Sequence, residues 1–163
     1  MNSESFNLTR NFDAPKDLVW RTLTEADLVQ RWYGPGVETV IHEFEVKPGG
    51  LWLNEMRMGE RSMNQRMEFT EVSPTERLVY LMSNADENWE VTANPMMPDW
   101  PRTLLTTVTL EDREGGGTLL TLDWDPHEST EAEKAAFAAS ASDFNKGWGA
   151  GMNIIDEILA ELS

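Results

Sequence analysis

Apolar and polar residues alternate along much of the chain, a pattern typical of strands that bury one face. The first such stretch covers residues 6–12, and Ala14-Pro15 then ends it and favours the start of a helix. Two short helical patterns follow, over residues 18–23 and then as far as about Trp32. Six more strand-like stretches cover residues 37–47, 51–58, 63–72, 77–83, 103–110 and 118–124.

The C-terminal part of the chain has a helical period. Thr130-Glu-Ala-Glu133 has the form of a capping box, which predicts the start of a helix. Thr24-Glu-Ala-Asp27 resembles the same motif and predicts the start of the second short helix. Apolar residues then recur at three- and four-residue steps to Leu162, so we expect one long helix from Thr130. The stripe consists of Phe137, Ala141, Phe144, Trp148, Ile155, Leu159 and Leu162.

These elements predict an α+β fold in a single domain over residues 1–163. Antiparallel strands with one apolar face need a cover, and only the C-terminal helix is long enough to supply it. We therefore expect a curved antiparallel sheet around that helix, with two short helices after the first strand.

Three glycines interrupt the predicted long helix around Trp148. Each glycine inside a helix costs roughly 1 kcal/mol relative to alanine. Gly147 and Gly151 lie on or beside the face that carries Trp148, which indicates that a strand or a ligand approaches the helix closely there. Gly149 lies on the opposite flank, and the pattern assigns it no role.

The composition narrows the class of protein. The 163 residues carry a formal net charge of −16, which repels phosphate backbones and anionic lipid, so we expect no nucleic-acid partner and no membrane insertion. The chain contains no cysteine, which excludes disulfides and thiol nucleophiles. No signal peptide and no apolar stretch long enough to span a bilayer are present. A cytoplasmic protein is expected.

Several short motifs along nearly the whole chain resemble those of one protein family. They are RNFDAPKDLVW (residues 10–20), LVQRWYGP (28–35), EVKPGG (45–50), EVSPTERLVY (71–80), GTLLTL (117–122) and Gly147-Trp148. The family they resemble is that of the activator of heat-shock protein 90 ATPase homologues.

The resemblance implies the helix-grip, START-like fold of the SRPBCC superfamily. That superfamily includes lipid and hormone binders, cyclases and co-chaperone domains, so the fold alone does not give a function. The eukaryotic co-chaperones of the family carry a separate N-terminal domain that contacts the chaperone. The resembling motifs start at Arg10, so we expect the START-like domain without that N-terminal domain, and hence no chaperone-activating role.

The predicted inner faces of the sheet and helix are rich in aromatic residues and methionine, with two amides. Apolar walls with few polar groups are typical of small-molecule sites, and methionine adapts to varied shapes. We therefore predict a cavity for a small hydrophobic or aromatic molecule, without a cofactor; the alternative is a filled core. The predicted ligand-binding residues are Tyr33, His42, Trp52, Asn54, Met56, Gln65, Met67, Phe69, Trp124, Phe144, Trp148 and Gly151.

Polar residues in these strands bear on two points: how the buried amides are paired, and whether the cavity holds an acid or a base. A buried amide is costly unless paired, so Asn54 and Gln65 are expected to pair with each other or the backbone, or else to await a ligand. A cofactor-free enzyme, such as a cyclase or hydrolase, would need an inward acid or base. His42, Glu55 and Asp123 are the candidates, although the alternation turns Glu55 and Asp123 outward. No metal-ligand motif occurs.

Residues 84–101 form a long predicted loop with four large apolar side chains, Trp89, Met96, Met97 and Trp100. This is more apolar surface than an ordinary loop carries. The loop is expected to close the cavity mouth, cover a sheet edge or form a homodimer contact. A co-chaperone-like interaction module, the remaining alternative, would instead need an apolar patch on the outer face of the sheet.

Overall fold

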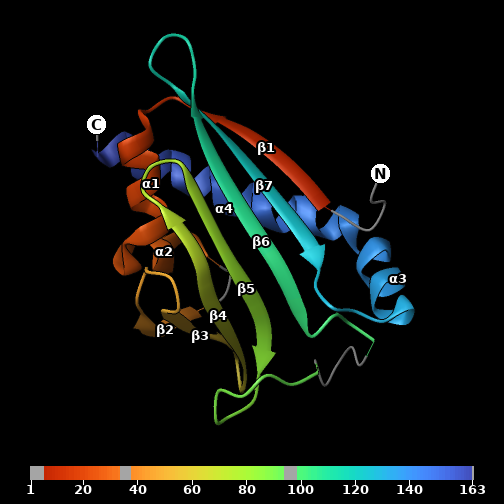
Figure 1. Cartoon of the computed structure of the whole chain (residues 1–163). Helices are drawn as coiled ribbons and strands as arrows, with labels where there is room; N and C mark the ends of the chain where they lie inside the picture. The colour runs from red at the N-terminus through yellow and green to blue at the C-terminus, as the bar shows by residue number, and fades with distance from the viewer. Residues whose placement is uncertain (1–5, 34–37, 94–98, 163) are drawn as a thin grey trace.

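The computed structural model describes residues 6–33, 38–93 and 99–162 (Figure 1). Its elements are β1 (Phe6–Phe12), α1 (Lys16–Thr24), α2 (Ala26–Trp32), β2 (Glu38–Phe44), β3 (Leu51–Met58), β4 (Arg61–Ser73), β5 (Arg77–Ala85), β6 (Thr103–Asp112), β7 (Thr118–Pro126), α3 (Glu131–Ala139) and α4 (Ala141–Leu162). None of the helices in these ranges combines the length and the apolar composition that a membrane-spanning segment needs.

The seven strands form one antiparallel sheet in the order β1-β7-β6-β5-β4-β3-β2. Consecutive strands are neighbours except for β1 and β2, which lie at opposite edges. The helices α1 and α2 carry the chain between those edges at one end of the sheet, and α4 crosses the inner face (Figure 1). This arrangement confirms the predicted helix-grip fold.

The core lies between the inner face of the sheet and α4. Alternate residues of β6, such as Leu104 and Val108, are buried, and so is Leu122 on the neighbouring strand β7. Ile155 and Ile158 of α4 pack against the same cluster and are almost inaccessible to solvent. The period of two in the strands and the longer period in α4 thus bring two apolar surfaces together.

The prediction of a single C-terminal helix is wrong, because the helix ends at Ser140 and a second one begins. The capping box is present: the Thr130 hydroxyl accepts from the Glu133 amide at 3.1 Å, and the Glu133 carboxylate accepts from the Thr130 amide at 2.8 Å. Ser140 has non-helical dihedrals (φ −100°, ψ 5°) and caps α3. Serine is less favourable than alanine inside a helix and favours helix ends.

In contrast to the capping box at Thr130, the one predicted at Thr24 is not formed. The N-cap of α2 is Glu25, which makes no side-chain capping bond, and the Thr24 hydroxyl donates to the Trp20 carbonyl at 2.8 Å. The Glu25 carboxylate accepts from Arg21 at 2.7 Å. Only one residue separates α1 from α2. The side chains of Thr24 and Glu25 therefore form hydrogen bonds with the last turn of α1 and do not cap the start of α2.

A β-bulge in β2 changes which residues face the core. Ile41 pairs with Asn54 and Glu43 pairs with Leu53, so His42 is the extra residue. Such an insertion reverses the alternation of faces. Ile41 therefore packs against the core, whereas the His42 side chain is 41% exposed. The expectation that His42 faces inward is wrong for this reason.

Candidate functional site

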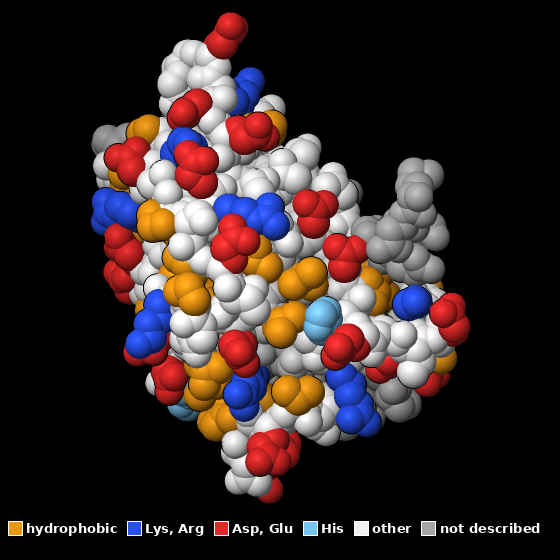
Figure 2. All heavy atoms as spheres, viewed as in Figure 1, with side chains coloured by type: hydrophobic (Ala, Val, Ile, Leu, Met, Phe, Trp, Pro, Cys, Tyr) orange, Lys and Arg blue, Asp and Glu red, His pale blue; other side chains and the backbone are white. Residues whose placement is uncertain are grey.

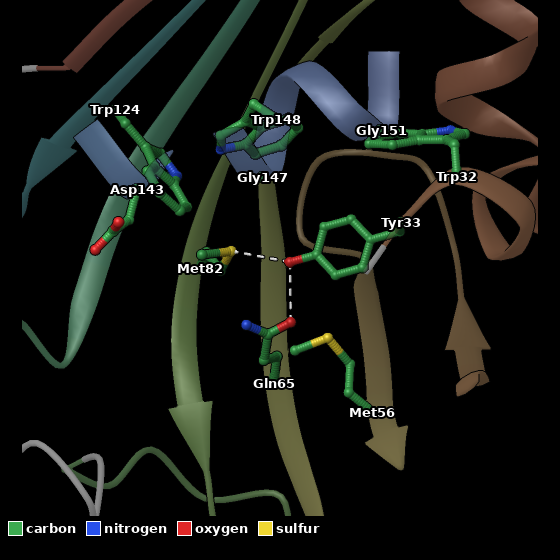
Figure 3. Close-up of a pocket in the computed structure, with 10 residues that line it drawn as sticks. All are labelled: Trp32, Tyr33, Met56, Gln65, Met82, Trp124, Asp143, Gly147, Trp148 and Gly151. Carbon is green, nitrogen blue, oxygen red and sulfur yellow. Dashed lines mark hydrogen bonds between the residues drawn. The ribbon is translucent and has the colours of Figure 1, made fainter. Parts of the chain in front are cut away.

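A cavity of about 280 Å³ lies between α4, the end of α2 and the inner face of the sheet. Its walls come from helices and from strands β3, β4, β5 and β7 (Figure 3). The lining residues are Trp32, Tyr33, Met56, Gln65, Met82, Trp124, Asp143, Gly147, Trp148 and Gly151. Apolar side chains dominate this wall, and its few polar groups are an amide, a phenol, indole N–H groups and one carboxylate.

Four aromatic rings surround the cavity, with Trp148 at their centre. The Trp148 ring lies 6.0 Å from that of Trp32, 6.4 Å from that of Tyr33 and 5.6 Å from that of Trp124, measured between centroids. Hydrogen bonds hold two of the outer rings: Trp32 donates to the Thr22 carbonyl at 2.7 Å, and Trp124 donates to the Thr106 hydroxyl at 2.8 Å. These walls are therefore set before any ligand enters.

The polar part of the cavity centres on Tyr33. Its hydroxyl donates to Gln65 Oε1 at 2.9 Å and lies 3.4 Å from the sulfur of Met82 (Figure 3). Burial raises the pKa of the Tyr33 phenol, so the group stays neutral at physiological pH. Within the described part of the chain, neither the Gln65 NH₂ group nor the Trp148 indole N–H donates to a protein acceptor. Both remain available to a ligand.

One stripe of α4 supplies the helical wall. Asp143, Gly147 and Gly151 recur at four-residue steps and therefore lie one above another on the helix. A Cβ atom placed on Gly147 would meet no atom within 4 Å, so this glycine borders open space. Gly151 is buried at the same cavity. The helix is thus thin along the stripe that faces the cavity.

Comparisons with known proteins identify the family. A model of the family "Activator of Hsp90 ATPase homolog 1-like protein" matches residues 13–160. The chain belongs to this family. No curated protein matches the chain.

Several solved structures have a similar fold. Protein Ms6760 from Mycobacterium smegmatis is 18% identical, with a TM-score of 0.79 over 99% of this chain and 94% of that one. A Rhodobacter sphaeroides protein is 23% identical, with a TM-score of 0.79 over 99% and 95%. A protein from Arthrobacter aurescens is 22% identical, with a TM-score of 0.80 over 99% and 90%. At these identities the likeness concerns the fold.

In this family member the cavity brings together part of the predicted set. The predicted residues that line it are Tyr33, Met56, Gln65, Trp124, Trp148 and Gly151. Sequence reasoning missed Trp32, Met82 and Asp143 as lining residues. The alternation of β5 could have indicated Met82, and the four-residue steps from Gly147 and Gly151 could have indicated Asp143.

Other predicted residues lie in the core beside the cavity. Trp52, Met67 and Phe69 are buried, and the Trp52 ring lies 4.9 Å from that of Tyr33. Asn54 is fully buried; its Oδ1 accepts from the Trp52 indole at 3.3 Å, while its Nδ2 has no hydrogen-bond partner among the described residues. The side chain of Phe144 lies outside the described residues.

The two amides do not pair with each other. Asn54 and Gln65 are opposite one another in β3 and β4, yet Gln65 bonds to Tyr33 and Asn54 bonds to Trp52. Each amide is therefore hydrogen-bonded to an aromatic side chain and not to the other amide. This leaves the Gln65 amide at the cavity and the Asn54 amide in the core.

His42 lies on the outer face of the sheet. Its Nε2 is 2.8 Å from Glu55 Oε1, and Arg57 donates to the same carboxylate at 3.2 Å. The hydrogen bond with His42, followed by that from Arg57, lowers the pKa of Glu55. The Trp89 ring packs 5.2 Å from the His42 ring. The outward direction predicted for Glu55 is confirmed, and its pair with Arg57 is a surface pair.

A second pocket of about 210 Å³ adjoins the cavity and shares Gln65, Met82 and Trp124 with it. Trp100, from the predicted loop 84–101, lines this pocket and packs 5.8 Å from the Phe137 ring. Met96 and Met97 lie outside the described residues. Within the described ranges, no group of three or more His, Asp or Glu side chains could hold a metal ion.

Proposed function

We propose that this protein binds a small hydrophobic or aromatic molecule in the cavity between α4 and the sheet. The observation that carries the proposal is the cavity of about 280 Å³ whose walls are three tryptophans, a tyrosine and two methionines. Small-molecule sites typically combine apolar walls with a few directed polar groups. The Gln65 NH₂ and the Trp148 N–H are two such groups.

The size of the cavity limits the ligand. Pockets for drug-sized molecules measure about 300–1,000 Å³, so this cavity stands at the small end. It suits one or two rings rather than a long lipid chain. A carbonyl, ether or hydroxyl oxygen on the ligand would accept from Gln65, which otherwise keeps an unpaired donor in a half-buried position.

The lining favours binding over catalysis. The two titratable side chains that line the cavity are those of Tyr33 and Asp143. Tyr33 is a neutral phenol whose hydroxyl is already bonded to Gln65, and Asp143 is exposed at the rim. His42, the residue that an enzyme of the cyclase or hydrolase type would need inside, faces outward.

The outer face of the sheet does not favour an interaction module. Figure 2 shows acidic and basic side chains scattered over that face, with apolar side chains between them rather than in one continuous patch. Among the described residues, Val91 is the exposed large hydrophobic side chain, at 47%. A protein partner that docks through apolar contacts would need more such surface.

Native mass spectrometry of the freshly purified protein tests the proposal first, by detecting a small molecule that remains bound. Titration with neutral one- and two-ring compounds tests it independently, because ligands beside Trp32, Trp124 and Trp148 should change the tryptophan fluorescence. We expect micromolar affinity for at least one such compound. The proposal fails if no small molecule co-purifies and if ligand-observed NMR detects no binding across a panel of such compounds.

A further inference from the structure

The side chains that line the cavity carry charge of one sign. None of the described lining residues is Lys or Arg, and Asp143 contributes the carboxylate. Lys146 is exposed on the next turn, but it lines no part of the cavity and forms no ion pair with Asp143 in the described structure. The whole chain carries a formal net charge of −16, which adds a negative field around the mouth.

The position of Asp143 in the first turn of α4 does not cancel this charge. A helix N-terminus is equivalent to roughly half a positive charge, whereas a carboxylate carries a full negative one. The sum of these two contributions is therefore negative. Figure 3 shows the carboxylate beside Trp124, at the edge of the ring of side chains and not in its middle.

The aromatic rings are arranged as walls that meet at steep angles. The planes of Trp124 and Trp148 cross at 86°, those of Tyr33 and Trp148 at 76°, and those of Trp32 and Tyr33 at 74°. In these edge-to-face pairs the edge of one ring meets the face of the other, and all four rings line the cavity, so a group inside it lies beside aromatic side chains on several sides. An organic cation within about 6 Å of a ring face is attracted by the electrons of that ring, most strongly with tryptophan.

We infer that the cavity prefers an organic cation: a quaternary or protonated ammonium group against the Trp124 and Trp148 rings at the Asp143 rim, joined to an apolar body deeper inside. This inference rests on the proposed function, because it names the class of small molecule that the cavity takes. A neutral ligand of the same shape gains the burial of its apolar surface but neither the ring attraction nor the attraction to Asp143. An anion meets repulsion from the rim.

Three compounds of matched shape test the charge preference. Phenyltrimethylammonium is a cation, tert-butylbenzene is its neutral counterpart, and benzenesulfonate is an anion with a similar tetrahedral head. Their dissociation constants are measured by tryptophan fluorescence and by ligand-observed NMR at low and at physiological salt. We expect the cation to bind at least tenfold more tightly than the neutral compound, and the anion to bind most weakly.

A pair of charge-removing variants locates the effect. Asp143→Asn should weaken binding of the cation by three- to tenfold and leave the neutral compound unchanged. Glu157→Gln removes the same charge from an exposed position about 21 Å further along α4, beyond the screening length of about 8 Å in physiological salt, and should change neither affinity. Thermal melting checks that both variants are folded.

The outcomes separate this inference from the proposed function. Tighter binding of the cation that depends on Asp143 supports the inference. Equal affinities for cation and neutral compound, or a loss that Glu157→Gln reproduces, overturn the inference but leave the binding function intact. If none of the three compounds binds, the inference fails; the proposed function fails with it only if, in addition, no small molecule co-purifies and the wider panel of neutral compounds shows no binding.

Discussion

Two glycines of α4 provide a matched pair of substitutions, one that should block the cavity and one that should not, without damage to the helix. Gly147 lines the cavity, whereas Gly149 does not, and a Cβ atom added at either position meets no atom within 4 Å. We therefore expect Gly147→Leu and Gly149→Leu to fold. Gly147→Leu should abolish or strongly weaken ligand binding, and Gly149→Leu should leave it unchanged.

The two substitutions should have the same effect on stability. Replacing glycine by leucine inside a helix removes a penalty of about 0.8 kcal/mol. For a domain of this length the gain corresponds to a rise of about 2–3 °C in Tm for each variant. Their effects on the cavity differ, because only the leucine of Gly147→Leu enters it. A leucine side chain fills a space on the order of 150 Å³, the volume of a void that accommodates benzene. Of the cavity of about 280 Å³, too little then remains for a substituted ring.

The assay combines differential scanning fluorimetry with titration of one bound compound against the wild type and both variants. We expect at least a tenfold loss of affinity in Gly147→Leu, or about 1.4 kcal/mol, together with a raised Tm in both variants. Full affinity in Gly147→Leu would show that the ligand lies elsewhere. An equal loss in Gly149→Leu would show that the helix, and not the space beside it, controls binding.

Three further predictions follow from the polar groups. His42→Ala should leave ligand affinity unchanged, since His42 lies on the outer face; a loss above threefold in the same titration would contradict this. Tyr33→Phe should lower the free energy of unfolding by about 1–2 kcal/mol in urea, because Gln65 Oε1 loses its donor; an unchanged midpoint would show that the bond is not stabilising. Burial raises the pKa of Tyr33 and Tyr80, the two tyrosines of the chain, so folding favours the neutral phenols. Stability is therefore full below the ordinary pKa near 10 and falls above it, by up to about 1.4 kcal/mol per pH unit for each tyrosine. Phenolate absorbance at 295 nm should appear only as the near-UV circular dichroism is lost, and phenolate formation in the folded protein would contradict the burial.

Much of the fold could be predicted because each strand buries one face. The alternation in residues 51–58 and 63–72 correctly placed Trp52, Asn54 and Met67 on the inner face. The helix that covers the sheet could be predicted because the C-terminal segment is the one helical pattern long enough to do so, whereas the order of strands in the sheet was not predicted.

The errors occurred where one residue changes the geometry. His42 is the extra residue of a bulge, after which the opposite set of alternate residues faces the core. The alternation of apolar and polar residues shows no break at this point, so the sequence does not reveal the change of face. Ser140 ends α3 although the apolar stripe continues past it, because the stripe reports which face is buried and not whether the backbone is continuous. Asp143 was missed as a lining residue because a charged residue does not fit a search for apolar walls.

The edge position of β1 links the completion of folding to the cavity. β1 pairs with β7, with Phe6 opposite Trp124, so the first strand to be synthesised has its partner strand only when residues 118–126 are available. Joining segments so distant in sequence costs more chain entropy than forming the local hairpins from β2 to β6. Trp124 is also a wall of the cavity, and α4, which follows it, supplies the opposite wall. A ligand that binds only the completed cavity would therefore stabilise the pairing of β1 with β7 and the packing of α4. It would lower the rate of local opening at both ends of the chain and leave that of the central hairpins unchanged.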